Sequence, residues 1–189
     1  MTQDLAKAIQ SLFSLELNDK DAAFLFLGYS SIMLRLKTFV MAFDLGKSLC
    51  PSEIPKIEYL NLLLFTHNHW DHYNKEKALQ IIEQTGTHVI ADIETSKDLL
   101  TSVSSDRITI GDSGSSFKTY KIDDYEVVAL RGVHVGPISQ YLVKLEGMKI
   151  FHGGDSGYWR HPSVFADIAF VPSGTARTCS PAVALATVM

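Results

Sequence analysis

The chain has 189 residues, a net charge of −4, 46% hydrophobic residues and 20% charged residues, an ordinary globular composition. This length predicts a single domain over residues 1–189, with a helical extension over residues 1–18. The acidic balance and the scattered basic residues exclude a basic stripe for nucleic acid, so we expect no nucleic-acid partner.

No apolar run approaches the roughly 18 residues of a membrane span. The N-terminus also lacks the pattern of a signal peptide. We therefore expect a cytoplasmic protein with no membrane partner. Cys50 and Cys179 lie far apart without metal-type spacing, and we expect two reduced thiols.

Hydrophobic periodicity predicts many short strands with a few helices between them. The expected elements are a helix over 2–14, an antiparallel meander of strands over 21–27, 32–36 and 39–43, a strand over 59–65, a helix over 75–84, a strand over 88–91, a helix over 93–100, strands over 108–110, 117–122 and 125–130, a hairpin of strands over 140–145 and 149–151, a strand over 168–171, and a helix from Ser180 to Met189. This pattern predicts an α/β fold of two packed sheets with helices outside.

The segment THNHWDHYN (residues 66–74) follows an apolar run and contains His67, His69, Asp71 and His72. In extended backbone His67 and His69 point the same way and can share one cation. Asp71 and His72 are adjacent, so they diverge from that pair and can serve a second cation. Imidazole and carboxylate suit zinc, iron or manganese. The alternative is a polar helix cap with incidental histidines, in which Asp71 caps the following helix.

Two later side chains are candidates to complete a metal centre. His134 lies in RGVHVGP (residues 131–137) and Asp155 lies in FHGGDSG (residues 151–157), each after a predicted strand and among glycines. A lone histidine or aspartate in a loop is more often merely solvated. The order His-x-His-x-Asp-His, then a strand-end histidine, then a strand-end Gly-Asp favours metal ligation here.

This order of residues resembles the metallo-β-lactamase superfamily. The segments FLGYSS (residues 26–31) and MAFD (residues 41–44) are similar to the opening hairpins of its lactonase-like branch, which includes L-ascorbate-6-phosphate lactonase. The segment GTART (residues 174–178), before Ser180, is similar to a glycine-rich loop and helix start late in that branch.

The resemblance implies a four-layer αββα sandwich with the metals at one edge of its two sheets. The ligands that it implies are His67, His69 and His134 for the first metal, Asp71 and His72 for the second, and Asp155 bridging both. Zinc is the expected metal, with manganese, iron or nickel as alternatives. The implied catalytic residues are Asp71 and Asp155, in a reaction where metal-bound hydroxide attacks an ester, lactone or phosphoester.

The family pattern carries one more histidine on a strand after the last helix, and no histidine follows His161 in this chain. We therefore expect a C-terminally incomplete chain that lacks the last strand, with a weak second metal site. The sheet edge left by such a missing strand favours a homo-oligomer.

Two residues are candidates to bind substrate. Tyr29 follows Gly28 in a predicted turn, and either lines the pocket or is a plain turn residue. Arg177 suits a carboxylate or phosphate group, with a surface salt bridge as the alternative. His152 is expected to be structural rather than a ligand.

The leading hypothesis is a metal-dependent hydrolase of a small soluble substrate, with an anionic molecule as one candidate. The second is a non-catalytic or partly active truncated metal-binding domain. The third is a nuclease of the same superfamily, against which the acidic balance counts.

Overall fold

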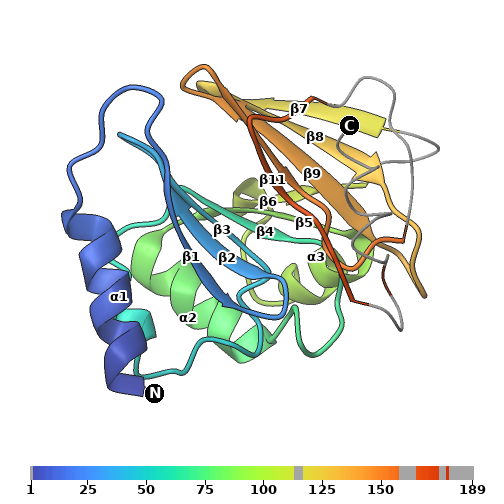
Figure 1. Ribbon diagram of the computed structural model, residues 1–189. Coiled ribbons are helices and arrows are strands. Elements are labelled where there is room, and N and C mark those ends of the chain that lie inside the picture. Colours follow the sequence, from blue (N-terminus) through green and yellow to red (C-terminus); the bar gives the residue numbers. More distant parts are fainter. Residues whose placement is uncertain (1, 113–116, 158–164, 175–177, 179–189) are drawn as a thin grey trace. The chain divides into compact units, whose positions relative to one another are not determined.

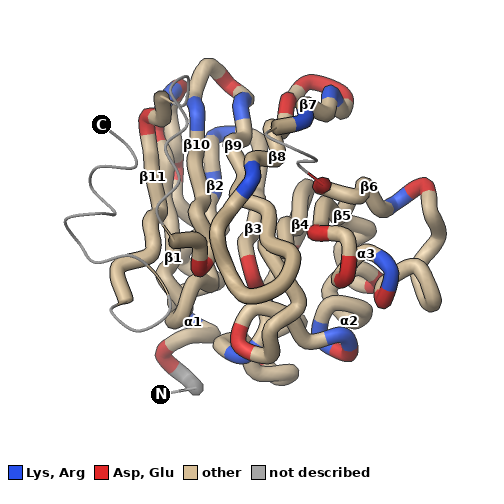
Figure 2. The backbone as a smooth tube through the Cα atoms, turned by 90° about the vertical axis from the view of Figure 1, so that its right-hand side faces the viewer, with Lys and Arg blue, Asp and Glu red and all other residues tan. Residues whose placement is uncertain are grey.

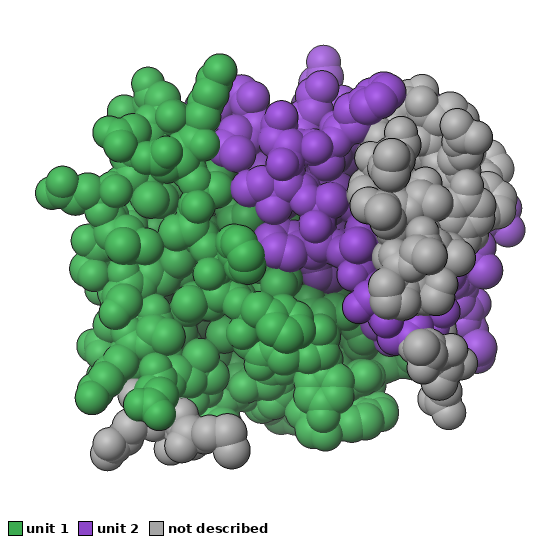
Figure 3. Space-filling view, viewed as in Figure 1, with its two compact units in different colours: residues 1–110 green, residues 111–189 purple. Residues whose placement is uncertain are grey.

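The computed structural model describes residues 2–112, 117–157, 165–174 and 178. The chain divides into two compact units, residues Met1–Ile110 and Gly111–Met189 (Figure 3). The sequence contains no composition shift at residue 110 that signals this division.

The first unit is a six-stranded sheet with three α-helices (Figure 1). Its elements are α1 (Thr2–Ser14), β1 (Ala23–Gly28), β2 (Ser31–Arg35), β3 (Val40–Phe43), the 3-10 helix η1 (Ile54–Lys56), β4 (Leu62–Phe65), α2 (Lys75–Thr85), β5 (His88–Ala91), α3 (Ile93–Leu99), the 3-10 helix η2 (Ser105–Arg107) and β6 (Ile108–Ile110). The strands lie in chain order. β1, β2 and β3 pair antiparallel, and β3 to β6 pair parallel.

All three helices of this unit share one core with alternate residues of the strands. Ile9 of α1, Ile81 of α2 and Leu99 of α3 are buried in the same cluster as Leu63 and Phe65 of β4. All four residues of β3 and of β4 are buried, as in strands with both faces covered. Because β3, β4 and β5 run parallel, their carboxyl ends meet at one edge of the sheet.

The second unit is a five-stranded sheet in the order β11-β10-β9-β8-β7. Its strands are β7 (Phe117–Ile122), β8 (Tyr125–Arg131), β9 (Ser139–Leu145), β10 (Met148–His152) and β11 (Ile168–Phe170). β8 and β10 both pair antiparallel with β9, so they run parallel to each other and end at the same edge. Val128, Leu130, Leu142 and Phe151 form a buried cluster in this unit.

These elements confirm the predicted mixed α/β fold with two sheets and few helices. The predicted strand over 59–65 begins three residues later, at Leu62. The prediction that Asp71 caps the following helix is wrong, because the N-cap of α2 is Asn74, whose side chain accepts a hydrogen bond from Lys77 N. The predicted helix from Ser180 lies outside the described residues.

Among the described residues, no helix is long and apolar enough to cross a membrane. Basic and acidic residues are interspersed along the backbone of α2 and α3 (Figure 2).

Candidate metal centre

The histidine cluster lies in a tight loop directly after β4, over residues 66–74, which is called the metal loop below. Residues 70–72 form a turn, and the backbone N–H groups of His72 and Tyr73 both donate to the carbonyl of His69, at 2.9 and 2.8 Å. His67 and His72 are buried, and His69 and Asp71 are half-buried. The turn therefore folds the end of the cluster back toward its beginning.

This turn brings the three imidazoles together. The ring centroid of His67 is 4.4 Å from that of His69 and 4.0 Å from that of His72. A ring nitrogen of His67 lies within 4.8 Å of one on each neighbour, and Nε2 of His72 lies 3.9 Å from Oδ2 of Asp71. The expectation that His72 diverges from His67 is wrong, because the backbone stops being extended after His69 and turns back.

Asp44, directly after β3, binds residues at both ends of this loop. Its side chain is buried, and Oδ1 accepts from Thr66 N at 2.8 Å. Oδ2 accepts from the Thr66 hydroxyl at 2.8 Å and from Nδ1 of His72 at 2.9 Å. The parallel pairing of β3 with β4 carries Asp44 to this position, since Asp44 N also donates to Leu64 O at 2.9 Å.

The same network sets which nitrogen of each imidazole carries the proton. Because a carboxylate only accepts, Nδ1 of His72 donates to Asp44. The Thr66 hydroxyl donates its proton to Asp44, so its oxygen accepts from Nδ1 of His67 at 3.0 Å. Both histidines are therefore assigned the tautomer in which Nε2 carries a lone pair, the form that binds a metal ion.

Backbone contacts hold the loop after β3 against the metal loop. A Cβ on Gly46 would meet the backbone carbon of His72 at 2.4 Å, so only glycine fits here. Nζ of Lys77 in α2 donates to Gly46 O at 2.9 Å. At the far end of the metal loop, the Tyr73 hydroxyl donates to Asp98 at 2.7 Å.

In the second unit, His134 and Asp155 stand in two loops that bind each other. Val133 N donates to Oγ of Ser156 at 2.9 Å, and Gly157 N donates to Val133 O at 2.6 Å. These loops follow β8 and β10, which end at the same edge of their sheet. His134 and Asp155 are each next in sequence to a residue of this contact.

Three other residues were predicted to be structural or to bind substrate. His152 is buried at the end of β10, and its Nδ1 accepts from Gly154 N at 3.2 Å, a contact within its own loop. Tyr29 is 54% exposed in the β1–β2 turn, and its hydroxyl binds Lys47. Arg177 lies outside the described residues.

Sequence reasoning missed Asp44, Thr66 and Lys47. Asp44 had a usable signal, because it is a carboxylate directly after a predicted strand, like Asp155. Thr66 and Lys47 had no such signal, since a threonine before a histidine and a lysine in a loop are common.

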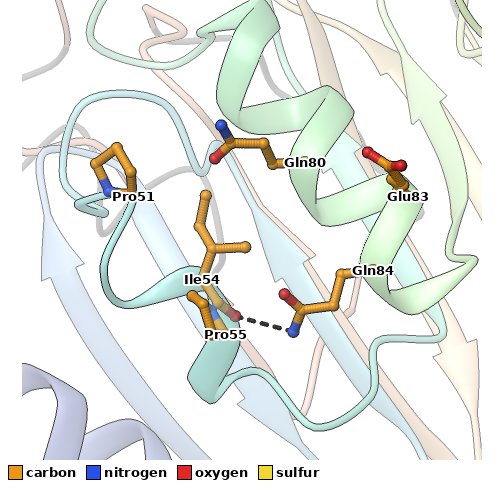
Figure 4. A pocket seen from close by; sticks show the side chains of 6 residues that line it. All are labelled: Pro51, Ile54, Pro55, Gln80, Glu83 and Gln84. Atoms are coloured by element: carbon orange, nitrogen blue, oxygen red, sulfur yellow. Dashed lines mark hydrogen bonds between the residues drawn. The ribbon is translucent and has the colours of Figure 1, made fainter.

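A separate hollow of about 340 Å³ lies between η1 and α2, lined by Pro51, Ile54, Pro55, Gln80, Glu83 and Gln84 (Figure 4). Glu83 is the one ionisable side chain in that lining. The hollow therefore lacks a metal-binding donor set, whereas three imidazoles and a carboxylate in the metal loop fit a divalent transition metal.

Comparisons with known proteins agree with this donor set. A family model described as the beta-lactamase superfamily domain matches residues 43–186. The UPF0173 metal-dependent hydrolase of Pyrococcus furiosus is 26% identical over 165 residues, which are 79% of this chain and 71% of that protein. Its counterpart in Thermococcus kodakarensis is 27% identical over 172 residues, 82% of this chain and 74% of that protein.

Among solved structures, Igni18, a metallo hydrolase from the archaeon Ignicoccus hospitalis, matches with a TM-score of 0.72 and 19% identity. The match covers 88% of this chain and 77% of that one. At this identity the likeness shows the fold alone. The family model covers most of the sequence, from the end of β3 onward, and the chain therefore belongs to the metallo-β-lactamase superfamily.

Proposed function

We propose that the chain is a metal-dependent hydrolase whose metal centre holds up to two cations. The proposed ligands are His67, His69 and His134 for one cation, Asp71 and His72 for a second, and Asp155 for both. Membership of the superfamily, the order of these residues in the sequence and the names of the relatives support this function.

The proposed substrate is a small soluble ester, lactone or phosphoester, as in a lactonase-like branch of the superfamily. Bound divalent cations supply Lewis acidity and a water molecule of lowered pKa in such sites. Zinc is the proposed metal, with manganese, iron or nickel as alternatives.

The chain's own residues have distinct roles in this proposal. Asp44 and Thr66 hold the His67 and His72 rings in the metal-binding tautomer before any metal arrives, which lowers the cost of ordering them. Asp71 is half-buried beside Nε2 of His72, so it can orient a nucleophile or accept a proton from it.

The observation that carries the proposal is the hydrogen-bonded chain from His67 through Thr66 and Asp44 to His72. A purely structural helix cap does not need two buried histidines with fixed Nε2 lone pairs. This row of hydrogen bonds therefore supports metal binding, because each bond sets which atom of the next group carries the proton.

The test is turnover by the full chain loaded with zinc, manganese, iron or nickel, on a panel of lactones, carboxylic esters and phosphodiesters. We expect metal-dependent hydrolysis of at least one class, lost in H67A and H69A but retained in H88A. Metal binding without turnover would favour the non-catalytic alternative, and hydrolysis of RNA or DNA alone would favour a nuclease.

A further inference from the structure

Tyr29, Lys47 and Trp70 form an exposed cluster beside the metal loop. Nζ of Lys47 donates to the Tyr29 hydroxyl at 2.8 Å and lies 4.1 Å from the centroid of the Trp70 ring. The same ammonium lies 4.9 Å from the Tyr29 ring, and the two rings meet edge to face at 6.2 Å. Trp70 stands between His69 and Asp71 in the sequence, so the cluster adjoins the proposed ligands.

Hydrogen bonds join the segments that carry this cluster to one another and to α2. The Ser48 hydroxyl donates to Gly28 O at 3.1 Å, which joins the loop after β3 to the β1–β2 turn. Lys47 N donates to Asp71 O at 3.5 Å, which joins it to the metal loop. Nζ of Lys77 donates to Lys47 O at 3.2 Å. The cluster is thus built from segments that are already packed, rather than from independent surface side chains.

Folding alone gives no reason for these aromatic residues. Tyr29 has φ +53°, a left-handed conformation that costs a residue other than glycine roughly 1–2 kcal/mol. Its side chain is 54% exposed and that of Trp70 is 65% exposed, so neither ring gains the full benefit of burial. A strained, exposed aromatic side chain next to a candidate active site points to a role in binding.

We infer that this cluster binds an anionic oxygen group, a phosphate or a carboxylate, of the hydrolase's substrate. Lys47 has three N–H donors, of which one goes to Tyr29. The Tyr29 oxygen accepts that bond, so its own O–H proton is available to an anion. The indole N–H of Trp70 is a further donor, beside the ammonium of Lys47 and the hydroxyl of Tyr29. Stacking over two rings holds the ammonium in place, which reduces the entropy lost when an anion binds.

The inference rests on the proposed function, because the anion would be part of the substrate of the neighbouring metal centre. It narrows that function to substrates carrying a negative charge close to the bond that is hydrolysed. Lys47 and Tyr29 act in this account as specificity residues, since they contact a charged group of the substrate that is not itself hydrolysed.

The binding test follows the fluorescence of Trp70. The sequence contains one other tryptophan, Trp159, so the W159F variant of the full chain reports on Trp70 alone. Inorganic phosphate and acetate are titrated separately, with glycerol as a neutral probe, before and after removal of metal by a chelator. We expect a saturable change with phosphate, acetate or both, none with glycerol, and persistence after chelation.

Lys47→Met should weaken this response by about tenfold or more, because a charged hydrogen bond is lost. Lys37→Met is the matched control, since it removes the same charge from an exposed pair with Asp19 and should leave the response unchanged. An unchanged response in K47M, or no response in the W159F parent, overturns the inference.

A kinetic test separates this inference from the proposed function. In the metal-loaded enzyme, K47M should raise KM about tenfold for mono-p-nitrophenyl succinate, which carries a carboxylate outside its reacting ester, and leave KM for neutral p-nitrophenyl acetate unchanged. Equal effects on both substrates count against the cluster while leaving hydrolysis established. Absence of hydrolysis by any metal-loaded form counts against the proposed function, and the fluorescence test then decides the cluster alone.

Discussion

Asp44 is a fully buried carboxylate whose oxygens accept hydrogen bonds from Thr66 N, from the Thr66 hydroxyl and from Nδ1 of His72. Burying a carboxylate without partners costs several kcal/mol, and these donors offset that cost. The same bonds set the tautomer of two histidines. One side chain therefore links the stability of the loop to its ability to bind metal.

Asp44→Asn is expected to lower metal affinity by about 10–100-fold, the usual effect of losing a side chain that orients a metal ligand. The amide keeps the shape of the carboxylate, but it no longer provides an acceptor for every donor. Competition with a chromophoric chelator measures the affinity. Asp19→Asn, at an exposed carboxylate, is the control, and equal affinities in the two variants would contradict this role for Asp44.

At the scale of elements, the position of the metal loop depends on loops and helix ends more than on the strands. Gly46 lets the loop after β3 approach the backbone of His72, and Asn74 ends the metal loop by capping α2. Asp92 caps α3 by accepting from Glu94 N at 2.9 Å and Thr95 N at 3.3 Å. These caps follow β4 and β5, so the same sheet edge that carries the ligands also carries the helix starts.

Gly46→Ala is expected to destabilise the fold by about 1–3 kcal/mol, because the added methyl overlaps backbone atoms that cannot rotate away. It should also weaken metal binding, since His72 must shift. Gly147→Ala is the comparison, because its Cβ meets no atom within 4 Å although its φ is +74°. That variant should lose stability through backbone strain and keep its metal affinity; urea denaturation and metal titration together distinguish the two.

Asp92 gives a pH-dependent prediction. Burial raises the pKa of its carboxyl above the ordinary 3.8, so the folded chain binds this proton more tightly than the unfolded chain does. Its contribution to stability therefore falls as the pH rises from 3.8 through the raised pKa. Asp92→Asn removes this charge and keeps an oxygen acceptor for the cap.

We expect D92N to be at least as stable as the parent at pH 7, with an advantage that grows with pH across that interval. Asp92→Ala should cost about 1 kcal/mol at pH 7, because the cap is lost. Urea unfolding between pH 4 and 7 measures both. A D92N advantage that shrinks with rising pH would refute the assigned direction.

At the scale of the whole molecule, the chain forms two compact units, each with its own sheet. Three histidines and a carboxylate lie in the first unit, and His134 and Asp155 lie in the second. A metal ion that binds the folded chain more tightly than the unfolded chain adds to the stability of the fold. Metal binding and the stability of the folded chain are therefore linked.

Zinc at a free concentration 100 times its Kd should stabilise the folded chain by about 2.7 kcal/mol, and a chelator should reverse the effect. The rise in Tm on adding zinc measures it. His134→Ala should reduce this rise, because one proposed ligand is removed. His88→Ala, at a histidine that is hydrogen-bonded to Thr109, is the control. It should change the Tm measured without zinc but keep the increase in Tm that zinc causes. An undiminished increase in H134A would exclude His134 as a ligand.

Much of the fold was predictable from local patterns. The periodicity of residues 75–84 predicts α2, and the alternation of residues 117–130 predicts β7 and β8, because these signals depend on neighbours in the sequence. The parallel pairing of β3 with β4 was not predicted, since the sequence carries no local mark of which strands meet. The position of Asp44 after a predicted strand was visible in the sequence, but its partners were not, because Thr66 and His72 lie 22 and 28 residues away.

The geometry of the candidate site was predictable only in part. The ligand types and their order are visible in residues 67–72, but extended backbone was the wrong premise after His69, where a turn returns His72 to His67. The Tyr29–Lys47–Trp70 cluster could not be foreseen, because its members come from three loops that meet only in the folded chain.

The sequence by itself determined the superfamily, the mixed α/β composition and the identity of the candidate ligands, because side-chain chemistry and hydrophobic period are properties of short segments. Only the tertiary structure decided the protonated nitrogen of His67 and His72 and the setting of Lys47 between two aromatic rings. These features depend on hydrogen bonds and ring contacts between residues distant in sequence, and such contacts exist only once the strands have taken their order in the sheet.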